Sequence, residues 1–229
     1  MINYNNLINE MSGTNFELTT FYKGLRMVKH MNPVSIAEPE FNFINKFIIN
    51  NNLKRGYEVA TAFGISMLAA GLGFKETGGK LVTMDAYIEE QFNNCSGYDE
   101  KHVVTYKDSD GFKYAQFLVS KYELYNNVNL TVGFSPIDTS KTIVNTFNNE
   151  KLDYIFIDAL HTEEAVMKDI EAVIPFLDDK FVLFLHDVHC FTTGKVQDYV
   201  QEKFGMTWTV AEGCEHPGNG YNLSYISKL

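Results

Sequence analysis

Two apolar segments in the second half of the sequence, residues 154–157 and 181–185, are followed directly by residues that can take part in acid–base chemistry. Asp158 ends the first segment, and His161 comes three residues later. The second segment ends on His186 and Asp187. A carboxylate beside an imidazole can orient a general base, and the same groups can bind a divalent cation. These four residues are therefore candidates for acid–base catalysis, for metal binding, or for both.

The residues between the two segments show the spacing of an amphipathic helix. The apolar face of this helix is expected to contain Val166, Ile170, Val173, Ile174 and Leu177. Two strands joined by a helix form a βαβ unit with parallel strands. Ligands of open α/β sheets bind just beyond the carboxyl ends of the strands. We therefore expect the four ionisable side chains to face one crevice.

An earlier segment, residues 58–66, joins a predicted strand to a predicted helix through small residues. Such a turn lets backbone N–H groups approach a ligand. Ala60 and Ala62 stand where the dinucleotide fingerprint GxGxxG would have glycine, which disfavours a nicotinamide or flavin cofactor. Asp85 ends the next predicted strand, where doubly wound folds bind ribose hydroxyls. The turn and the acid together indicate a nucleoside-containing cofactor, although an ordinary turn and a helix cap would look similar.

Strands and helices alternate along the chain from Gly56 onwards. The expected strands are 57–60, 80–84, 128–132, 154–157 and 181–185, followed by two antiparallel closing strands at 206–210 and 221–226. The expected helices follow Gly64 and His161 and cover 112–125, 138–148 and 194–204. We predict a single domain over residues 1–229, in which an N-terminal helical cap (1–52) precedes the core (53–229). The core is expected to be a Rossmann-like α/β fold, with a seven-stranded, mostly parallel sheet and helices on both faces.

Composition limits the class of partner. The 229-residue chain has a formal net charge of −10 and no cluster of Lys or Arg, so a small molecule is a better partner than nucleic acid. The three cysteines have no CxxC spacing, which argues against a disulfide framework or a zinc knuckle. The sequence has neither an apolar run of membrane-spanning length nor a signal peptide. We therefore expect a cytoplasmic protein that does not contact a membrane.

Taken in order, these motifs resemble those of one enzyme family. The pattern ExxTxxGxS begins at Glu58, Asp85 ends the second strand, and Gly-x-Ser at 133–135 follows the third. FIDxxH, ending on His161, and the later His-Asp pair complete the series. This order resembles class I S-adenosylmethionine-dependent methyltransferases, most closely small-molecule O-methyltransferases of the catechol and caffeoyl-CoA type and their relatives with a D-x-x-H motif. The resemblance extends from about residue 35 to the C-terminus.

The resemblance implies a binding site for S-adenosylmethionine. Its methionine part would lie against Glu58 and the turn 60–64, its ribose against Asp85, and its adenine between Phe134 and Ser135. The full set of residues expected to contact the cofactor is Ser35, Glu58, Ala60, Thr61, Phe63, Gly64, Ser66, Asp85, Phe134, Ser135 and Asp158. Ala60 replaces a glycine that the family usually has, and its methyl group would either crowd the cofactor or shift the backbone.

The resemblance also implies a reaction, the transfer of a methyl group to a hydroxyl of a small molecule. We expect His161 to be the general base and Asp158 to orient it or to bind a metal ion. In metal-dependent members, acids after the fourth and fifth strands bind Mg²⁺, and Asp158 and Asp187 match them. His186 as a third ligand would favour a softer ion such as Mn²⁺, Fe²⁺ or Zn²⁺. The alternative is a hydrogen-bonded cluster without metal.

Two other functions stay open at this point. One is a nucleotide-cofactor oxidoreductase on a related fold, and the other is a non-catalytic relative that binds the cofactor without chemistry. The sequence does not identify the methyl acceptor. It also leaves the oligomeric state open, although homodimers are common in the family that it resembles.

Overall fold

The computed structural model describes residues 7, 36–86, 110–187, 193–216, 220–221 and 223–229. Within them, seven strands form one sheet in the order β3-β2-β1-β4-β5-β9-β6, and a second, two-stranded sheet joins β7 to β8. The strands of the large sheet are β1 Arg55–Val59, β2 Lys80–Asp85, β3 Val128–Val132, β4 Leu152–Ile157, β5 Leu177–His186, β6 Thr209–Val210 and β9 Leu223–Ser227. The small sheet consists of β7 Glu215–His216 and β8 Gly220–Tyr221.

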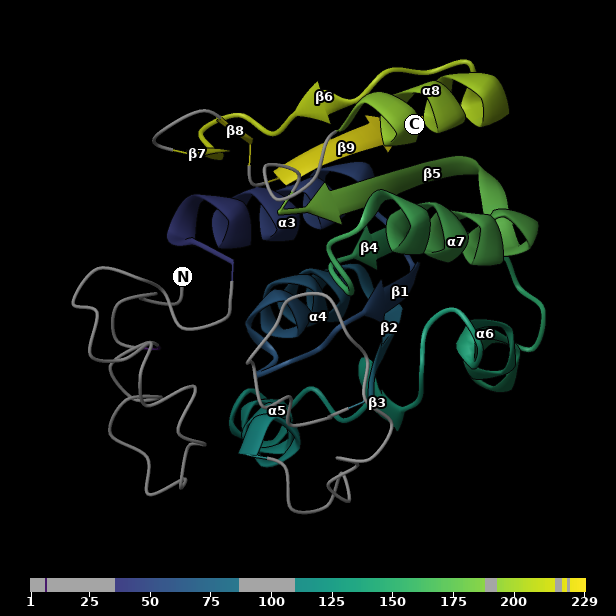
Figure 1. Cartoon of the computed structure of the whole chain (residues 1–229). Helices are drawn as coiled ribbons and strands as arrows, with labels where there is room; N and C mark the ends of the chain where they lie inside the picture. The colour runs from purple at the N-terminus through teal and green to yellow at the C-terminus, as the bar shows by residue number, and fades with distance from the viewer. Residues whose placement is uncertain (1–6, 8–35, 87–109, 188–192, 217–219, 222) are drawn as a thin grey trace.

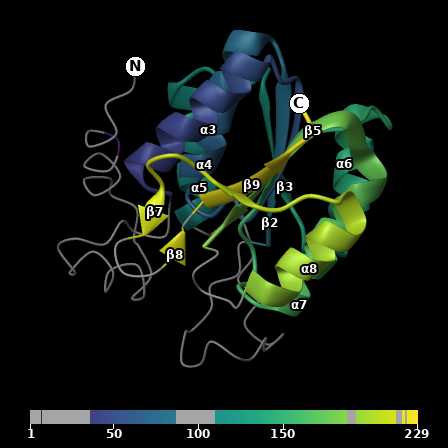
Figure 2. The same ribbon diagram turned by 90° about the horizontal axis from the view of Figure 1, so that it is seen from above.

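Helices cover both faces of the large sheet (Figures 1 and 2). One layer contains α3 Glu38–Asn51, α4 Ile65–Thr77 and α5 Asp110–Lys121, and the other contains α6 Thr139–Phe147, α7 Glu163–Val173 and α8 Thr193–Phe204. The central strand β4 contributes side chains to the cores on both faces of the sheet, because successive side chains of a strand point to opposite faces. Tyr154 and Phe156 pack in the core under α3, α4 and α5, whereas Ile155 and Ile157 pack in the core under α6, α7 and α8.

The strand order of the sheet reverses between β1 and β4, and this reversal determines where a ligand can bind. Strand β1 pairs in parallel with β2 on one side and with β4 on the other. Its last residue, Val59, lies opposite Met84 on β2 and Ile157 on β4. The loops after these three strands therefore leave the same edge of the sheet. In open α/β sheets, such a reversal point is where ligands bind.

The predicted architecture is confirmed, including the antiparallel end of the sheet. Strand β9 runs antiparallel to both β5 and β6. Among the described helices, none is long and apolar enough to cross a membrane. Of the helical cap predicted for residues 1–52, the structure describes residue 7 and the part from residue 36, where α3 packs against α4. The division of the chain into an N-terminal cap and a core stays a prediction.

Several element boundaries were predicted wrongly, among them the start of β6, which is Thr209 rather than residue 206. Leu177 does not extend the helix, because α7 ends at Val173 and a 3-10 turn, Ile174–Phe176, follows. Pro175 lies in that turn, and proline has no N–H with which to continue a helix. Leu177 instead begins β5, four residues before the predicted start, because the exposed Asp179 and Lys180 hide the strand from an apolar pattern. Helix α5 ends at Lys121 rather than at residue 125.

Candidate active site

The turn after β1 has a backbone conformation that side chains disfavour. Ala60 has φ of 72° and Ala62 has φ of 45°, both in the left-handed region where a Cβ is crowded. The N–H of Ala60 donates to the carbonyl of Met84 at 2.8 Å, and the N–H of Ala62 donates to Oδ2 of Asp85 at 2.8 Å. The turn is thus tied to the end of β2. Glycine would adopt the conformation of Ala60 without strain, which explains why glycine is expected there.

Glu58 is fully buried beneath this turn. Its Oε1 accepts hydrogen bonds from Thr83 Oγ1 at 2.9 Å and from Ser66 Oγ at 3.2 Å. Its Oε2 is buried and has no hydrogen-bond partner among the described residues. Burial raises the pKa of Glu58 to about 8, although the two hydrogen bonds oppose the rise. A buried oxygen without a partner is a place where a ligand can supply the missing hydrogen bond.

The rest of the turn leads into α4. Thr61 is buried, with its Oγ1 2.6 Å from Oγ1 of Thr83. Phe63 is only 2% exposed, and its ring contacts that of Tyr114, so its side chain belongs to the core. Gly64, with φ of 81°, is the N-cap of α4. Phe63 and Gly64 therefore offer a ligand backbone atoms rather than side chains.

The residues expected near an adenine follow β3. The N–H of Phe134 donates to Oδ2 of Asp138 at 2.9 Å. The hydroxyl of Ser135 donates to Oδ1 of Asp169 on α7, and burial raises the pKa of Asp169 to about 6. The hydroxyl of Ser135 is therefore already bound within the protein. Ser35, the remaining residue expected to contact a cofactor, lies outside the described part of the chain.

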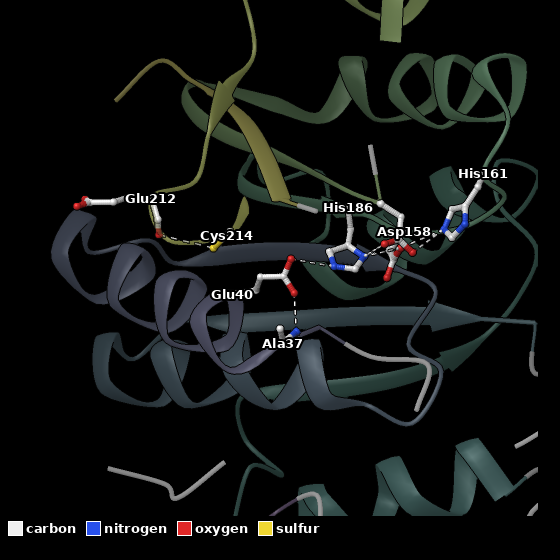
Figure 3. A network of polar contacts seen from close by, with 8 residues as sticks. Ala37, Glu40, Asp158, His161, His186, Glu212 and Cys214 are labelled. Atoms are coloured by element: carbon white, nitrogen blue, oxygen red, sulfur yellow. Dashed lines mark hydrogen bonds and ion pairs between the residues drawn. The ribbon is translucent and has the colours of Figure 1, made fainter. Parts of the chain in front are cut away.

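The residues that follow β4 and β5 meet as predicted (Figure 3). Nε2 of His161 lies 3.3 Å from Oδ1 of Asp158 and 3.5 Å from Oδ2 of Asp187. The side chains of Asp158 and Asp187 are 19% and 26% exposed, and that of His161 is 36% exposed. One ligand atom from each of the three residues lies within 4.8 Å of the others, close enough to share a cation. This cluster faces outward at the end of two neighbouring strands.

His186 is part of this network but lies deeper in the protein. It is 5% exposed, and its Nδ1 lies 3.1 Å from Oδ1 of Asp158 and 3.4 Å from Oδ1 of Asp187. Its Nε2 lies 3.3 Å from Oε1 of Glu40, which is 1% exposed. Neither of these last two atoms forms a regular hydrogen bond, so their contact is an ion pair. His186 thus sits between three carboxylates, whereas the outward cluster is completed by His161.

Glu40 was not predicted from the sequence. It shares the buried face of α3 with Phe41, Ile44 and Ile48, and an acid on an otherwise apolar helix face was the available signal. The aromatic residues of α3 pack across β5 and β9, which places the helix. The ring centroids of Phe47 and Phe184 are 5.4 Å apart, and those of Phe43 and Tyr225 are 5.7 Å apart. This packing brings Glu40, in the first turn of α3, next to His186 at the end of β5 (Figure 3).

The charges in the network stabilise one another. Burial alone would raise the pKa of Asp158, but the charge of His186 and hydrogen bonds from both imidazoles lower it to about 2. Burial alone would lower the pKa of His186, but Asp158, Asp187 and Glu40 raise it well above its ordinary value. The pKa of His161 is also raised, because the hydrogen bond and charge of Asp158 and the charge of Asp187 outweigh its burial.

Comparisons with known proteins agree with this geometry. A family model described as "Methyltransferase domain" matches residues 58–188, more than half of the chain. No curated protein is found as a sequence relative.

The fold also matches solved structures over nearly the whole chain. An O-methyltransferase from Bacillus cereus in complex with SAH has a TM-score of 0.57 and 13% identity, covering 97% of each chain. TomG, an O-methyltransferase from Streptomyces achromogenes in complex with SAM, has a TM-score of 0.57 and 11% identity, covering 98% of this chain and 97% of its own. A protein from Staphylococcus aureus, provisionally assigned as a caffeoyl-CoA O-methyltransferase, has a TM-score of 0.56 and 19% identity, covering 98% of both chains. At these identities the likeness establishes a shared fold.

Proposed function

Because the chain belongs to the family of methyltransferase domains, we propose that it transfers a methyl group from S-adenosylmethionine to a hydroxyl of a small molecule. The observation that carries this proposal is the position of the cluster formed by Asp158, His161 and Asp187. It lies at the end of β4 and β5, next to the turn after β1, where the strand order reverses. A cofactor held by that turn would present its methyl group near the cluster.

The turn has features that suit S-adenosylmethionine. The unpartnered Oε2 of Glu58 can interact with the amino group of the methionine part, and a cationic ligand would favour the ionised carboxylate. Asp85, at the end of β2, can accept hydrogen bonds from ribose hydroxyls while its Oδ2 holds the N–H of Ala62. When bound, S-adenosylmethionine supplies an electrophilic methyl group on a positively charged sulfonium.

His161 acts as the general base, and Asp158 orients its imidazole. If Nε2 of His161 carries the proton and donates to Oδ1 of Asp158, Nδ1 keeps a lone pair for the acceptor's proton. Removing that proton makes the acceptor oxygen a better nucleophile. With S-adenosylmethionine bound, this oxygen would bond to the methyl carbon, and the electron pair of the broken carbon–sulfur bond would stay on sulfur. Asp158 and Asp187 stabilise the imidazolium that His161 becomes.

As an alternative to base catalysis by His161, we propose that this cluster can hold a divalent cation, with His161 as a ligand instead of the base. Two carboxylates and one imidazole form the donor set, which suits Mn²⁺, Fe²⁺ or Zn²⁺ better than Mg²⁺. A cation there would lower the pKa of a hydroxyl bound to it. His186, proposed from the sequence as a third ligand, lies beneath the cluster with each of its nitrogens near carboxylates. His161 is therefore the better placed imidazole.

The partners follow from the same chemistry. We propose a small-molecule acceptor, and the net charge of −10 disfavours nucleic acid. A homodimer stays a proposal that rests on the resemblance to this family. The family match and the cluster at the end of β4 argue against the alternative of a nicotinamide-dependent oxidoreductase.

The experiment that tests the proposed function follows the methyl group. The purified chain would be incubated with S-adenosylmethionine labelled in the methyl group and a panel of phenols, catechols and aliphatic alcohols. We expect a labelled product and S-adenosylhomocysteine in equal amounts, with at least one hydroxyl compound. Asp158→Asn is the matched variant that should lose transfer. Cofactor binding without transfer to any hydroxyl would instead support a non-catalytic relative, and retention of bound NAD would support an oxidoreductase.

A further inference from the structure

A buried ion pair lies directly beneath the proposed reaction centre. Oε1 of Glu40 lies 3.3 Å from Nε2 of His186, and both side chains are almost fully buried. The free energy needed to remove two charged groups from water often equals the attraction between them, so a buried ion pair contributes little to stability by itself. A hydrophobic pair of similar volume would serve packing equally well. A role in organising neighbouring groups is therefore worth testing.

The carboxylate of Glu40 has two tasks, one for each oxygen. Oε1 faces His186, whereas Oε2 accepts a hydrogen bond from the backbone N–H of Ala37 at the start of α3. A glutamine has the same shape but only one accepting oxygen. Its one oxygen could accept a hydrogen bond from protonated His186 or from the N–H of Ala37, but not from both. Glu40 therefore links the beginning of α3 to the imidazole of His186 in a way that only a carboxylate allows.

His186, which Glu40 holds in place, in turn contacts Asp158 in the reaction centre. Its Nδ1 contacts Oδ1 of Asp158 at 3.1 Å, and the same oxygen lies 3.3 Å from Nε2 of His161. A rotation of the His186 ring would move its Nδ1 away from that oxygen. With Nε2 held by Glu40, the ring has a contact at each end, and Asp158 is fixed between two imidazoles. Figure 3 shows Glu40, His186, Asp158 and His161 in one row.

We propose that Glu40 is a positioning residue of the reaction centre, which acts through His186 to fix the carboxylate of Asp158 against His161. Its importance for methyl transfer rests on the proposed function, but the contacts themselves do not. The simpler interpretation is that Glu40 only caps α3 through Ala37. The two interpretations differ in what happens at His161, which is separated from Glu40 by two intervening side chains.

Nuclear magnetic resonance of the full chain, labelled with ¹⁵N in its histidines, can separate them. The ring nitrogen signals report the tautomer and hydrogen bonding of each imidazole. His161→Asn and His186→Gln variants assign the two sets of signals. The test variant is Glu40→Gln, and Glu38→Gln is the matched control, since Glu38 lies in the same first turn of α3 but is exposed.

We expect Glu40→Gln to shift the ring signals of both His186 and His161, and Glu38→Gln to shift neither. In a His186→Gln background, Glu40→Gln should cause no further shift at His161, because the connecting ring is gone. If Glu40→Gln does not fold, Glu40→Asp, which keeps the charge but shortens the reach, should shift the same two sets of signals. Unchanged His161 signals in a folded Glu40 variant would overturn the proposal and leave only the helix cap.

Calorimetric titration with S-adenosylmethionine on the same samples separates this proposal from the proposed function. We expect the dissociation constant of Glu40→Gln to stay within about twofold of the wild-type value, since the carboxylate oxygens of Glu40 face His186 and Ala37 rather than the turn 60–64. Large weakening of cofactor binding in this variant would contradict a role confined to Asp158 and His161. A wild-type chain that binds no S-adenosylmethionine would refute the proposed function, while the signals of His161 would still decide the role of Glu40.

Discussion

The Nε2 atom of His161 lies 3.3 Å from the Oδ1 atom of Asp158, at the outer end of strand β4. This contact fixes one nitrogen of the ring against a carboxylate and leaves the other for a ligand. It also raises the pKa of His161, so the imidazole is a stronger base than an isolated histidine. A role of His161 as a base predicts a change in the rate of methyl transfer, whereas a purely structural role predicts a change in melting temperature alone.

Replacement of His161 by Asn should keep cofactor affinity but lower the rate of methyl transfer by about 10²–10⁴, the usual loss for a general base. The wild-type rate should rise with pH through the raised pKa of His161, since only the neutral ring accepts a proton, with a midpoint above about 6.5. Glu164→Gln is the control, because Glu164 is exposed in the following helix. A His161→Asn protein that melts at lower temperature yet turns over normally per folded molecule would remove His161 from the mechanism.

Replacement of Ala60 by Gly should stabilise the protein, because φ of 72° strains an alanine but not a glycine. We expect the free energy of unfolding to increase by about 1 kcal/mol, measured by denaturant titration. The matched control is Ala172→Gly in helix α7, where the same substitution should destabilise by about 1 kcal/mol. Equal destabilisation at both positions would show that the turn is not strained at Ala60.

Replacement of Glu58 by Gln should change stability in a pH-dependent way. The folded pKa of about 8 exceeds the ordinary value of 4.5, so Glu58 loses its proton in the unfolded chain at lower pH than in the folded one. The free energy of unfolding therefore falls progressively as pH rises from about 4.5 to 8. The glutamine side chain does not ionise, so the Glu58→Gln variant should gain stability relative to wild type over this range, by a few kcal/mol at the upper end. Thermal melting of both ligand-free proteins at pH 5 and pH 9 measures the difference. A constant difference at the two pH values would contradict a buried, proton-binding Glu58.

Removal of metal tests the cluster of Asp158, His161 and Asp187. We expect the metal-free chain to bind Mn²⁺, with Asp187→Asn weakening that binding by about tenfold or more, because one carboxylate ligand is lost. Calorimetry with Mn²⁺ measures both constants, and Asp179→Asn at the exposed start of β5 is the control. No Mn²⁺ binding, together with full activity in excess chelator, would show that the cluster is hydrogen-bonded without metal.

The sequence predicted the strand-end residues because apolar runs and the residues that end them are local features. Asp158 and His161 follow one run and Asp187 follows the next, so a parallel sheet was enough to bring them together. The sequence did not predict Glu40, because its contact with His186 depends on how α3 packs across β5 and β9. The direction of a side chain beyond a strand end is similarly set by tertiary packing, so His186 was expected in the crevice but lies beneath it.

The most direct test of the account is calorimetric titration of S-adenosylmethionine into the wild-type chain and into Asp85→Ala. Asp85 should accept hydrogen bonds from the ribose, each worth roughly 1.5–3 kcal/mol for a charged acceptor, so affinity should fall by about tenfold or more. Glu76→Ala, an exposed acid on α4, is the control for net charge, and melting curves show whether loss of the Ala62 contact has disturbed the turn. The account predicts a wild-type chain that binds one cofactor and an Asp85→Ala chain that binds it much more weakly. Absence of binding to the wild type, or equal affinity in a folded Asp85→Ala variant, would contradict the proposed site.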